Sequence, residues 1–202
     1  MLIKYLYVNY KMNNYNYYNR IIILIIIIII LLCYTNLEEH FTTKNVFDTY
    51  GTITDDGIKI LINNLNIQKN DIFLDAGCGK GNVIKYFAEN TPIKKLSGIE
   101  FIKDRYYESI KTLKTIKNYN SIKTIENKES NIEYNKQKNK NNNQIELKIV
   151  NGNMYDEENK NIFLDATIIF TCSTCFSDEL LNHITFLCSK NKKLKYFISQ
   201  KK

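Results

Sequence analysis

The amino-acid sequence predicts an α/β fold, a parallel β-sheet with helices on both of its faces. From Phe41 onward, short apolar runs alternate with amphipathic stretches, which is typical of strands interleaved with helices. One of these apolar runs ends in an acid and leads through three alternating glycines into a helical pattern. The chain has 202 residues, of which 44% are hydrophobic, so it can bury the core of one domain.

The expected elements follow one another in a regular order along the chain. Thr54 is expected to cap a helix over 57–64, because apolar residues recur there at helical spacing. Ser177 is expected to cap a helix over 178–189 in the same way. Two further helices are predicted over 82–89 and 103–117, the second with Tyr107, Ile110, Leu113 and Lys114 on one face. Strands are predicted over 71–74, 96–99, 145–150, 166–170 and 194–199.

Composition divides the chain into an N-terminal part and one domain. Residues 1–20 are basic and polar, 21–34 form a hydrophobic segment that resembles a signal anchor, and 41–202 form the domain. Between about 118 and 144 the sequence is rich in Asn and Lys and lacks an apolar period, so we expect an insertion loop there.

The hydrophobic segment has three open interpretations. Ile21 to Leu32 are all aliphatic, but the fourteen residues of 21–34 would rise only about 21 Å as a helix, against a hydrocarbon core of about 30 Å. An uncleaved anchor, a removed presequence and a compositional bias without targeting function all fit. With an anchor, the domain is expected to face the cytosol, because five cysteines without framework spacing indicate reduced thiols. A location of the protein in the nucleus or in an organelle stays open.

The net charge of +7 permits an acidic partner without naming one. Nucleic acid, a nucleosome and an anionic membrane surface all fit this charge. Much of the excess consists of lysines diluted among asparagines in the 118–144 stretch, where a solvated insertion explains them equally well. Composition therefore leaves nucleic-acid binding and membrane association open.

The most informative segment is the pattern D-x-G-x-G-x-G. Asp75 ends a strand and precedes Gly77, Gly79 and Gly81. The glycines permit a sharp turn and allow a ligand to lie against main-chain N–H groups at the carboxyl edge of the sheet. An acid at the strand end would repel phosphate but can hold an amino group. This combination predicts the methionine end of S-adenosylmethionine as the ligand.

Two further positions fit a nucleoside. Glu100 ends the second predicted strand, where a carboxylate can accept hydrogen bonds from ribose hydroxyls. NAD-binding proteins share that acid, so it is the glycine spacing and Asp75 that distinguish S-adenosylmethionine. Asn153 follows the third predicted strand, where its amide could read an adenine edge, although a plain turn fits as well.

The segment after the fourth predicted strand contains a C-x-x-C spacing at Cys172 and Cys175. A structural zinc site needs about four ligands, and the remaining cysteines and two histidines show no matching spacing, so no metal is expected. The same segment is expected to position an acceptor. Ser173 and Phe176 are its candidate residues, together with Cys172.

Together these motifs resemble the disruptor-of-telomeric-silencing family, which are histone lysine methyltransferases without a SET domain. The resemblance covers roughly 47–199 and implies a Rossmann-like class I methyltransferase fold. It further implies that Tyr50 and Thr54 belong to a loop closing over the methionine end of the cofactor. It assigns Asp75, Gly77 and Gly79 to the cofactor cradle, and it assigns Glu100 to the ribose.

Two departures from the family pattern stand out. Cys172 occupies the position where the family carries an asparagine that helps to form the channel for the lysine amine, and a thiol is a weak hydrogen bonder. Class I enzymes also finish with an antiparallel hairpin beyond the fifth parallel strand, for which we expect no residues here.

These observations predict an S-adenosylmethionine-dependent methyltransferase that acts on a protein with an accessible lysine, histone or other. Cofactor contacts are expected from Tyr50, Thr54, Asp75, Gly77, Gly79, Gly81, Glu100 and Asn153, and transfer-site contacts from Tyr50, Cys172, Ser173 and Phe176. Two alternatives stay open. One is a membrane-anchored methyltransferase of a non-histone protein or a small molecule, and the other is a cofactor-binding module without catalysis.

Overall fold

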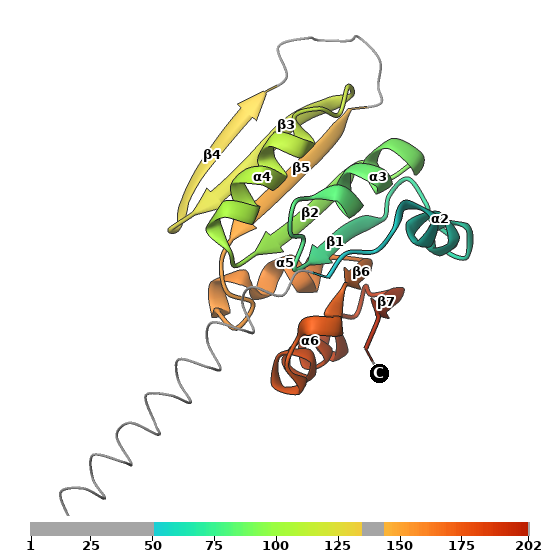
Figure 1. Ribbon diagram of the computed structural model, residues 1–202, viewed down its shortest axis with the longest axis vertical. Coiled ribbons are helices and arrows are strands. Elements are labelled where there is room, and N and C mark those ends of the chain that lie inside the picture. The colour runs from blue at the N-terminus through green and yellow to red at the C-terminus, as the bar shows by residue number, and fades with distance from the viewer. Residues whose placement is uncertain (1–50, 135–143, 202) are drawn as a thin grey trace, which may run out of the picture. The chain divides into compact units, whose positions relative to one another are not determined.

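A computed structural model describes residues 51–134 and 144–201 of the chain. Within them a seven-stranded sheet has the order β4-β3-β5-β2-β1-β6-β7 (Figure 1). All neighbouring strands pair in parallel except β3 and β4, which are antiparallel. The strands are β1 (Ile72–Ala76), β2 (Lys95–Glu100), β3 (Tyr119–Glu126), β4 (Glu129–Tyr134), β5 (Ile145–Asn151), β6 (Ile168–Thr171) and β7 (Tyr196–Ser199).

The six strands β3-β5-β2-β1-β6-β7 form the parallel part of a doubly wound sheet. The chain moves outward from β1 through β2 to β3 and β4, comes back to β5 beside β2, and then crosses to the other side of β1 for β6 and β7. In such sheets a ligand binds beyond the carboxyl ends of the strands, at the point where the strand order reverses. This point lies between β1 and β6.

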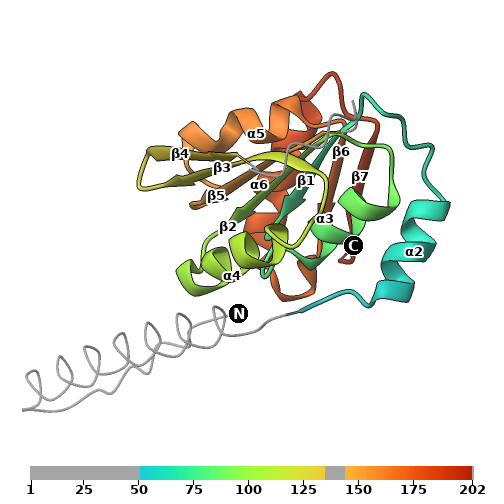
Figure 2. The same cartoon turned by 90° about the horizontal axis from the view of Figure 1, so that it is seen from above.

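Helices cover both faces of the sheet (Figures 1 and 2). Side chains of three helices join one apolar core with the sheet, and side chains of two others join a second core on the opposite face. The first group is α2 (Asp55–Asn63), α3 (Asn82–Asn90) and α4 (Lys103–Leu113), and the second is α5 (Lys160–Asp165) and α6 (Asp178–Lys190). The predicted α/β fold with helices on both faces is therefore confirmed.

Two helix starts follow the predicted capping chemistry. The Thr54 side chain accepts a hydrogen bond from the Gly57 N–H at the start of α2, and Ser177 accepts one from the Leu180 N–H at the start of α6. These hydroxyls satisfy backbone donors that have no partner inside the helix. The two starts were predictable because a cap is a local interaction.

The prediction of an insertion loop over 118–144 is wrong for the described residues up to Tyr134. They form the hairpin of β3 and β4, which extends the sheet beyond β5. Backbone pairing with β5 stabilises β3, and every residue of β4 is exposed. The two strands can therefore form although their sequences carry only a weak apolar pattern. Residues 135–143 lie outside the described part.

Helix α4 differs from its prediction in length and in its buried face. It ends at Leu113 rather than near 117, and its buried residues are Tyr106, Ser109 and Leu113. Tyr107 is exposed, and its hydroxyl donates to the Glu126 carboxylate at the end of β3. The predicted face was rotated by about one residue because Tyr106 and Tyr107 fit an apolar stripe equally well.

The N-terminal predictions concern residues that the structure does not describe. The segments 1–20 and 21–34 and the side chain of Tyr50 all lie outside the described residues. In the described ranges, no helix has the length and apolar character needed to cross a membrane.

Candidate cofactor and transfer site

The turn after β1 brings its backbone into unusually close contact with the opposite wall of the site. Gly77, Gly79 and Gly81 all have positive φ angles, of 85°, 53° and 78°. A Cβ at Gly77 would lie 2.7 Å from Cζ of Phe176, a separation that real Cβ atoms do not show. Glycine is therefore required at Gly77 both by its backbone conformation and by the lack of space.

The N–H groups of this turn are already used within the protein. Gly77 and Cys78 both donate to the Ile99 carbonyl, at 2.9 and 3.0 Å, and Gly81 donates to the Cys78 carbonyl at 2.8 Å. The Gly79 N–H donates to Oε2 of Glu100 at 2.8 Å. The sequence predicts that a ligand lies against main-chain N–H groups of this turn; in the structure these four N–H groups are hydrogen-bonded within the protein and shape the turn.

Glu100 is held at the end of β2 by two backbone donors. Besides Gly79, the Ile102 N–H donates to its Oε1 at 2.8 Å, and the residue is 6% exposed. Each carboxylate oxygen can accept more than one hydrogen bond. The carboxylate is therefore fixed in place and retains acceptor capacity for a hydroxyl-bearing ligand.

Asp75 lies beneath the turn rather than in it. It belongs to β1, is 2% exposed, and pairs in register with Gly98 of β2 and Phe170 of β6. Burial, reinforced by the nearby negative charge of Glu100, raises the pKa of its carboxyl to about 8. At neutral pH the carboxyl is therefore mostly protonated. The predicted contact between an Asp75 carboxylate and a ligand amino group requires that the positive amino group, once bound, lowers this pKa.

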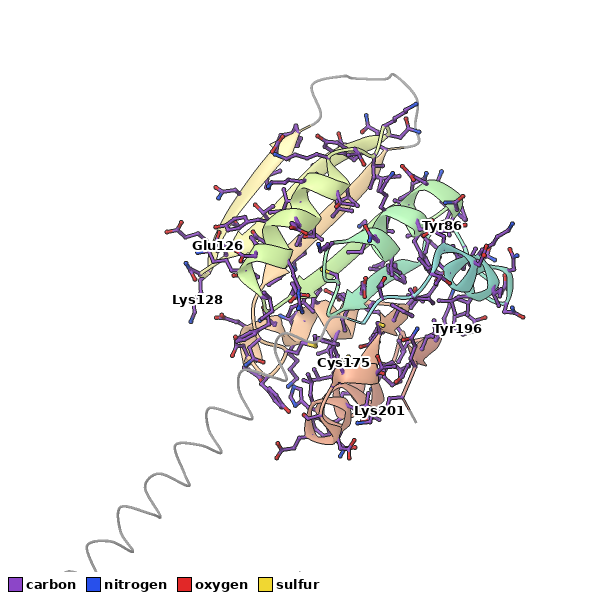
Figure 3. The ribbon with its side chains drawn as sticks, viewed as in Figure 1. Tyr86, Glu126, Lys128, Cys175, Tyr196 and Lys201 are labelled. Carbon is purple, nitrogen blue, oxygen red and sulfur yellow. The ribbon has the colours of Figure 1, made fainter. Side chains whose placement is uncertain are left out.

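A cavity of about 260 Å³ opens at the carboxyl edge beside this turn. It is lined by residues of the turn after β1, of the end of β2 and of the segments that follow β2, β5 and β6, which lie far apart in the sequence. Six predicted site residues line it together: Gly77, Gly79, Glu100, Asn153, Cys172 and Phe176. Figure 3 labels Cys175, which also lines the cavity.

One end of the cavity lies after β2 and β5. Oδ1 of Asn153 accepts the Tyr155 N–H at 3.0 Å, and the carbonyl of Asn153 accepts a hydrogen bond from Asn159. Phe101, Met154 and Tyr155 join Asn153 in the lining. Sequence reasoning missed these three side chains, although the position of Phe101 directly after the strand-end acid was visible in the sequence.

The other end is lined by sulfur and an aromatic ring. Cys172, Cys175 and Phe176 line it together with Gly51. Burial raises the pKa of the Cys172 thiol, which keeps the thiol neutral, and the thiol donates to Oε1 of Gln200 at 2.9 Å. Gln200 follows β7, so a carboxamide reaches the Cys172 thiol from a strand that the sequence did not connect with it.

Three predicted site residues have other positions. Ser173 is fully buried and does not line the cavity, because its hydroxyl is bound to Ser199 at 2.7 Å and accepts the Lys201 N–H. The Thr54 hydroxyl is engaged in capping α2. Gly81 starts α3, where a Cβ would meet Ser109 of α4 at 3.2 Å. None of the three residues lines the cavity.

Metal ligands are not gathered in the described part of the chain. No group of three or more His, Cys, Asp or Glu side chains there is arranged to hold an ion. Cys33 lies outside the described residues.

A doubly wound sheet with a glycine turn after its first strand and an acid at the end of its second is the architecture of the Rossmann-like class I methyltransferases, and NAD-binding folds share these features. The chain belongs to the DOT1 histone methylation protein family, whose family model matches residues 36–202. S-adenosylmethionine is the cofactor of this family, as the glycine spacing predicted. The protein is thus a methyltransferase.

Solved structures of other proteins are similar to the chain at low identity. An RNA methyltransferase from Salinibacter ruber, in complex with S-adenosyl-L-homocysteine, is 10% identical over 70% of this chain and 71% of its own, with a TM-score of 0.46. A precorrin 8w decarboxylase from Methanobacterium thermoautotrophicum is 16% identical over 72% and 60%, with a TM-score of 0.48. No curated protein sequence matches the chain.

Proposed function

We propose that the protein transfers a methyl group from S-adenosylmethionine to the amine of a lysine in a protein, with a histone as the first candidate. The family match over residues 36–202 supports the histone-type acceptor. The single structural observation behind the proposal is the cavity of about 260 Å³ that joins the glycine turn and Glu100 to the sulfur-lined end at Cys172 and Phe176.

The residues present fit the cofactor. Gly77 and Gly79 line the cavity with backbone alone, so the methionine end could lie against the turn, and Glu100 offers a fixed carboxylate for the ribose hydroxyls. Asn153, Phe101 and Tyr155 would surround the adenine. Asp75 lies beneath the glycine turn, where the positive charge of a bound amino group would lower the raised pKa of its carboxyl and favour the ionised form.

The cofactor would supply a methyl group on a positively charged sulfur. The task left to the chain is to align a neutral amine with that methyl and to exclude water. The ring of Phe176 can face a positive sulfur favourably, and the neutral thiol of Cys172 places no charge beside the amine. We propose from the sequence alone that Tyr50 also lies at the end of the cavity that Cys172 and Phe176 line.

The test uses the full chain and two measurements. Calorimetric titration with S-adenosylhomocysteine should show selective binding, while ATP and NAD should not bind. Transfer of radiolabelled methyl from S-adenosylmethionine should then label histones, and replacing the accepting lysines by arginine should abolish the label. Binding without labelling of any histone would overturn the histone acceptor, and absence of binding by folded protein would overturn the cofactor site.

A cofactor-binding module without catalysis is the second candidate. It is favoured by one observation: the transfer end presents thiols at Cys172 and Cys175 and buries the Ser173 hydroxyl. A protein that binds S-adenosylhomocysteine yet transfers no methyl to histones, other proteins or small amines would support it.

The place of the reaction is a separate proposal. We infer from the sequence that the 21–34 segment holds the domain at a membrane, with the domain facing the cytosol. Fractionation of cells expressing the full chain or a variant lacking 21–34 tests this. Equal recovery of both in the supernatant would overturn it, and a non-histone acceptor would gain support if only the full chain stays with membranes.

A further inference from the structure

One face of the sheet is left open where the β3–β4 hairpin extends it. Strand register places three residues side by side across this face: Ser97 of β2, Lys148 of β5 and Lys123 of β3. The same row continues with Leu74 of β1 and Ile132 of β4. Leu74 is buried in the core formed with α5 and α6, whereas Ile132 is 51% exposed. On this face the helices therefore bury β1, whereas Ile132 of the edge strand β4 stays exposed.

The two lysines at the centre of this row are directly opposed. Lys123 and Lys148 are Cα partners on neighbouring strands, and like charges in that arrangement destabilise a sheet. Lys148 is only partly exposed, and burial, with the charge of Lys123 as the second cause, lowers the pKa of its ammonium. The chain thus tolerates an unfavourable pair of positive charges at this position.

The surface around the pair also carries a third lysine, Lys95, and two carboxylates, Glu146 and Asp165. Each carboxylate has a lysine partner: Glu146 is 4.0 Å from Lys95, and Asp165, whose charge partly favours the Lys148 ammonium, is 3.2 Å from Lys193. Among the described residues, the ion pairs include neither Lys123 nor Lys148. The two ammonium groups can therefore accept an anion from outside.

The surroundings of the pair form a hollow of about 500 Å³. The hydroxyls of Ser97 and Ser121 add donors to its floor, on the same face as the lysines. Tyr134, which is 65% exposed, and Ile132 form one rim. Ammonium and hydroxyl donors suit a phosphate, and an exposed aromatic beside them offers a stacking surface for a base.

We propose that this hollow binds the phosphate of a nucleotide or of a nucleic-acid strand, with Lys123 and Lys148 as its charge partners and Tyr134 beside the base. The site is distinct from the cofactor cavity, because the lining residues of the two have none in common. It does not depend on the identity of the methyl acceptor.

Fluorescence anisotropy and calorimetry on the full chain test the proposal with three probes: inorganic phosphate, AMP and a single-stranded oligonucleotide of about ten nucleotides. Lys148→Met and Lys123→Gln should each weaken binding of the preferred probe about tenfold or more at low salt. The matched control is Lys114→Gln, which removes a lysine that pairs with Glu133 rather than facing the hollow, and it should leave affinity within about twofold.

A stability measurement gives an independent result. Removing one of two opposed like charges should raise the melting temperature of Lys148→Met by about 2 °C, and phosphate-bearing ligand should raise that of the natural chain but not of the variant. Preference for AMP over the oligonucleotide identifies a free nucleotide, and the reverse identifies a strand. The proposal is overturned if no probe binds, or if binding survives both substitutions. S-adenosylhomocysteine affinity should be unchanged throughout.

Discussion

The two ends of the cofactor cavity are built by different means. The end near β1 and β2 consists of backbone in special conformations and one buried carboxylate, with Gly77 and Glu100 at its centre. The end near β6 and β7 consists of side chains, with the Cys172 thiol bound to Gln200 from a different strand. Backbone geometry tolerates almost no substitution, whereas a side-chain wall can be rebuilt. In the proposed function, the first end would hold the constant cofactor and the second a variable acceptor.

The largest effect is expected from Gly77→Val, which changes the end of the cavity that is built from backbone. A branched side chain at φ 85° is strained, and its Cβ would overlap Phe176. We expect the affinity for S-adenosylhomocysteine to fall about a hundredfold, measured by calorimetry. Ile93→Val is the control, because Ile93 is fully buried in the core and does not line the cavity, so the change should lower stability without lowering the affinity of folded protein. Unchanged affinity in Gly77→Val would remove the contrast between the two ends.

Glu100→Gln should weaken the same binding about tenfold. The amide keeps one acceptor but turns an NH₂ group toward one of the two backbone donors, Gly79 or Ile102. Glu108→Gln is the matched control, since Glu108 is an exposed partner of Lys80. Equal affinities of the two variants would show that the fixed carboxylate plays no part in binding.

Asp75→Asn tests the buried charge beneath the backbone end through stability against pH. The carboxyl of the unfolded chain loses its proton near its ordinary pKa of 3.8, whereas the folded one keeps it up to about 8. The stabilisation is therefore complete below pH 4 and is lost as pH rises toward 8, at up to about 1.4 kcal/mol per pH unit.

Urea unfolding at several pH values measures this slope. The variant should lack the Asp75 component, so its free energy of unfolding should fall less between pH 5 and 8 than that of the natural chain. Parallel curves for the two proteins would mean that Asp75 is not held protonated by its surroundings.

The smallest effect is expected at the side-chain end. Cys172→Ser and Cys175→Ser should each change S-adenosylhomocysteine affinity less than about threefold, because they line the far end of the cavity. In the natural chain, the ligand should slow maleimide labelling of Cys175. Buried Cys188, whose thiol pKa burial raises to about 11, is the internal reference. Labelling that is indifferent to ligand would place Cys175 outside the site.

Much of the fold was predictable because its signals are local. The caps at Thr54 and Ser177 involve atoms three residues apart, and the glycine turn needs its special residues in one short stretch. The β3–β4 hairpin was missed for the opposite reason: its strands gain their stability from pairing with β5, which composition does not reveal.

The sequence by itself determined the class of fold, the glycine turn and the acid at Glu100, since each depends on residue type and short spacing. Only the tertiary structure decided which side chains face the cavity. It turned Ser173 into the interior, placed Asp75 beneath the cradle, brought Gln200 to Cys172, and set Lys123 beside Lys148. The reason is physical: exposure, pKa and neighbours across strands arise from packing between distant segments, and no local pattern encodes them.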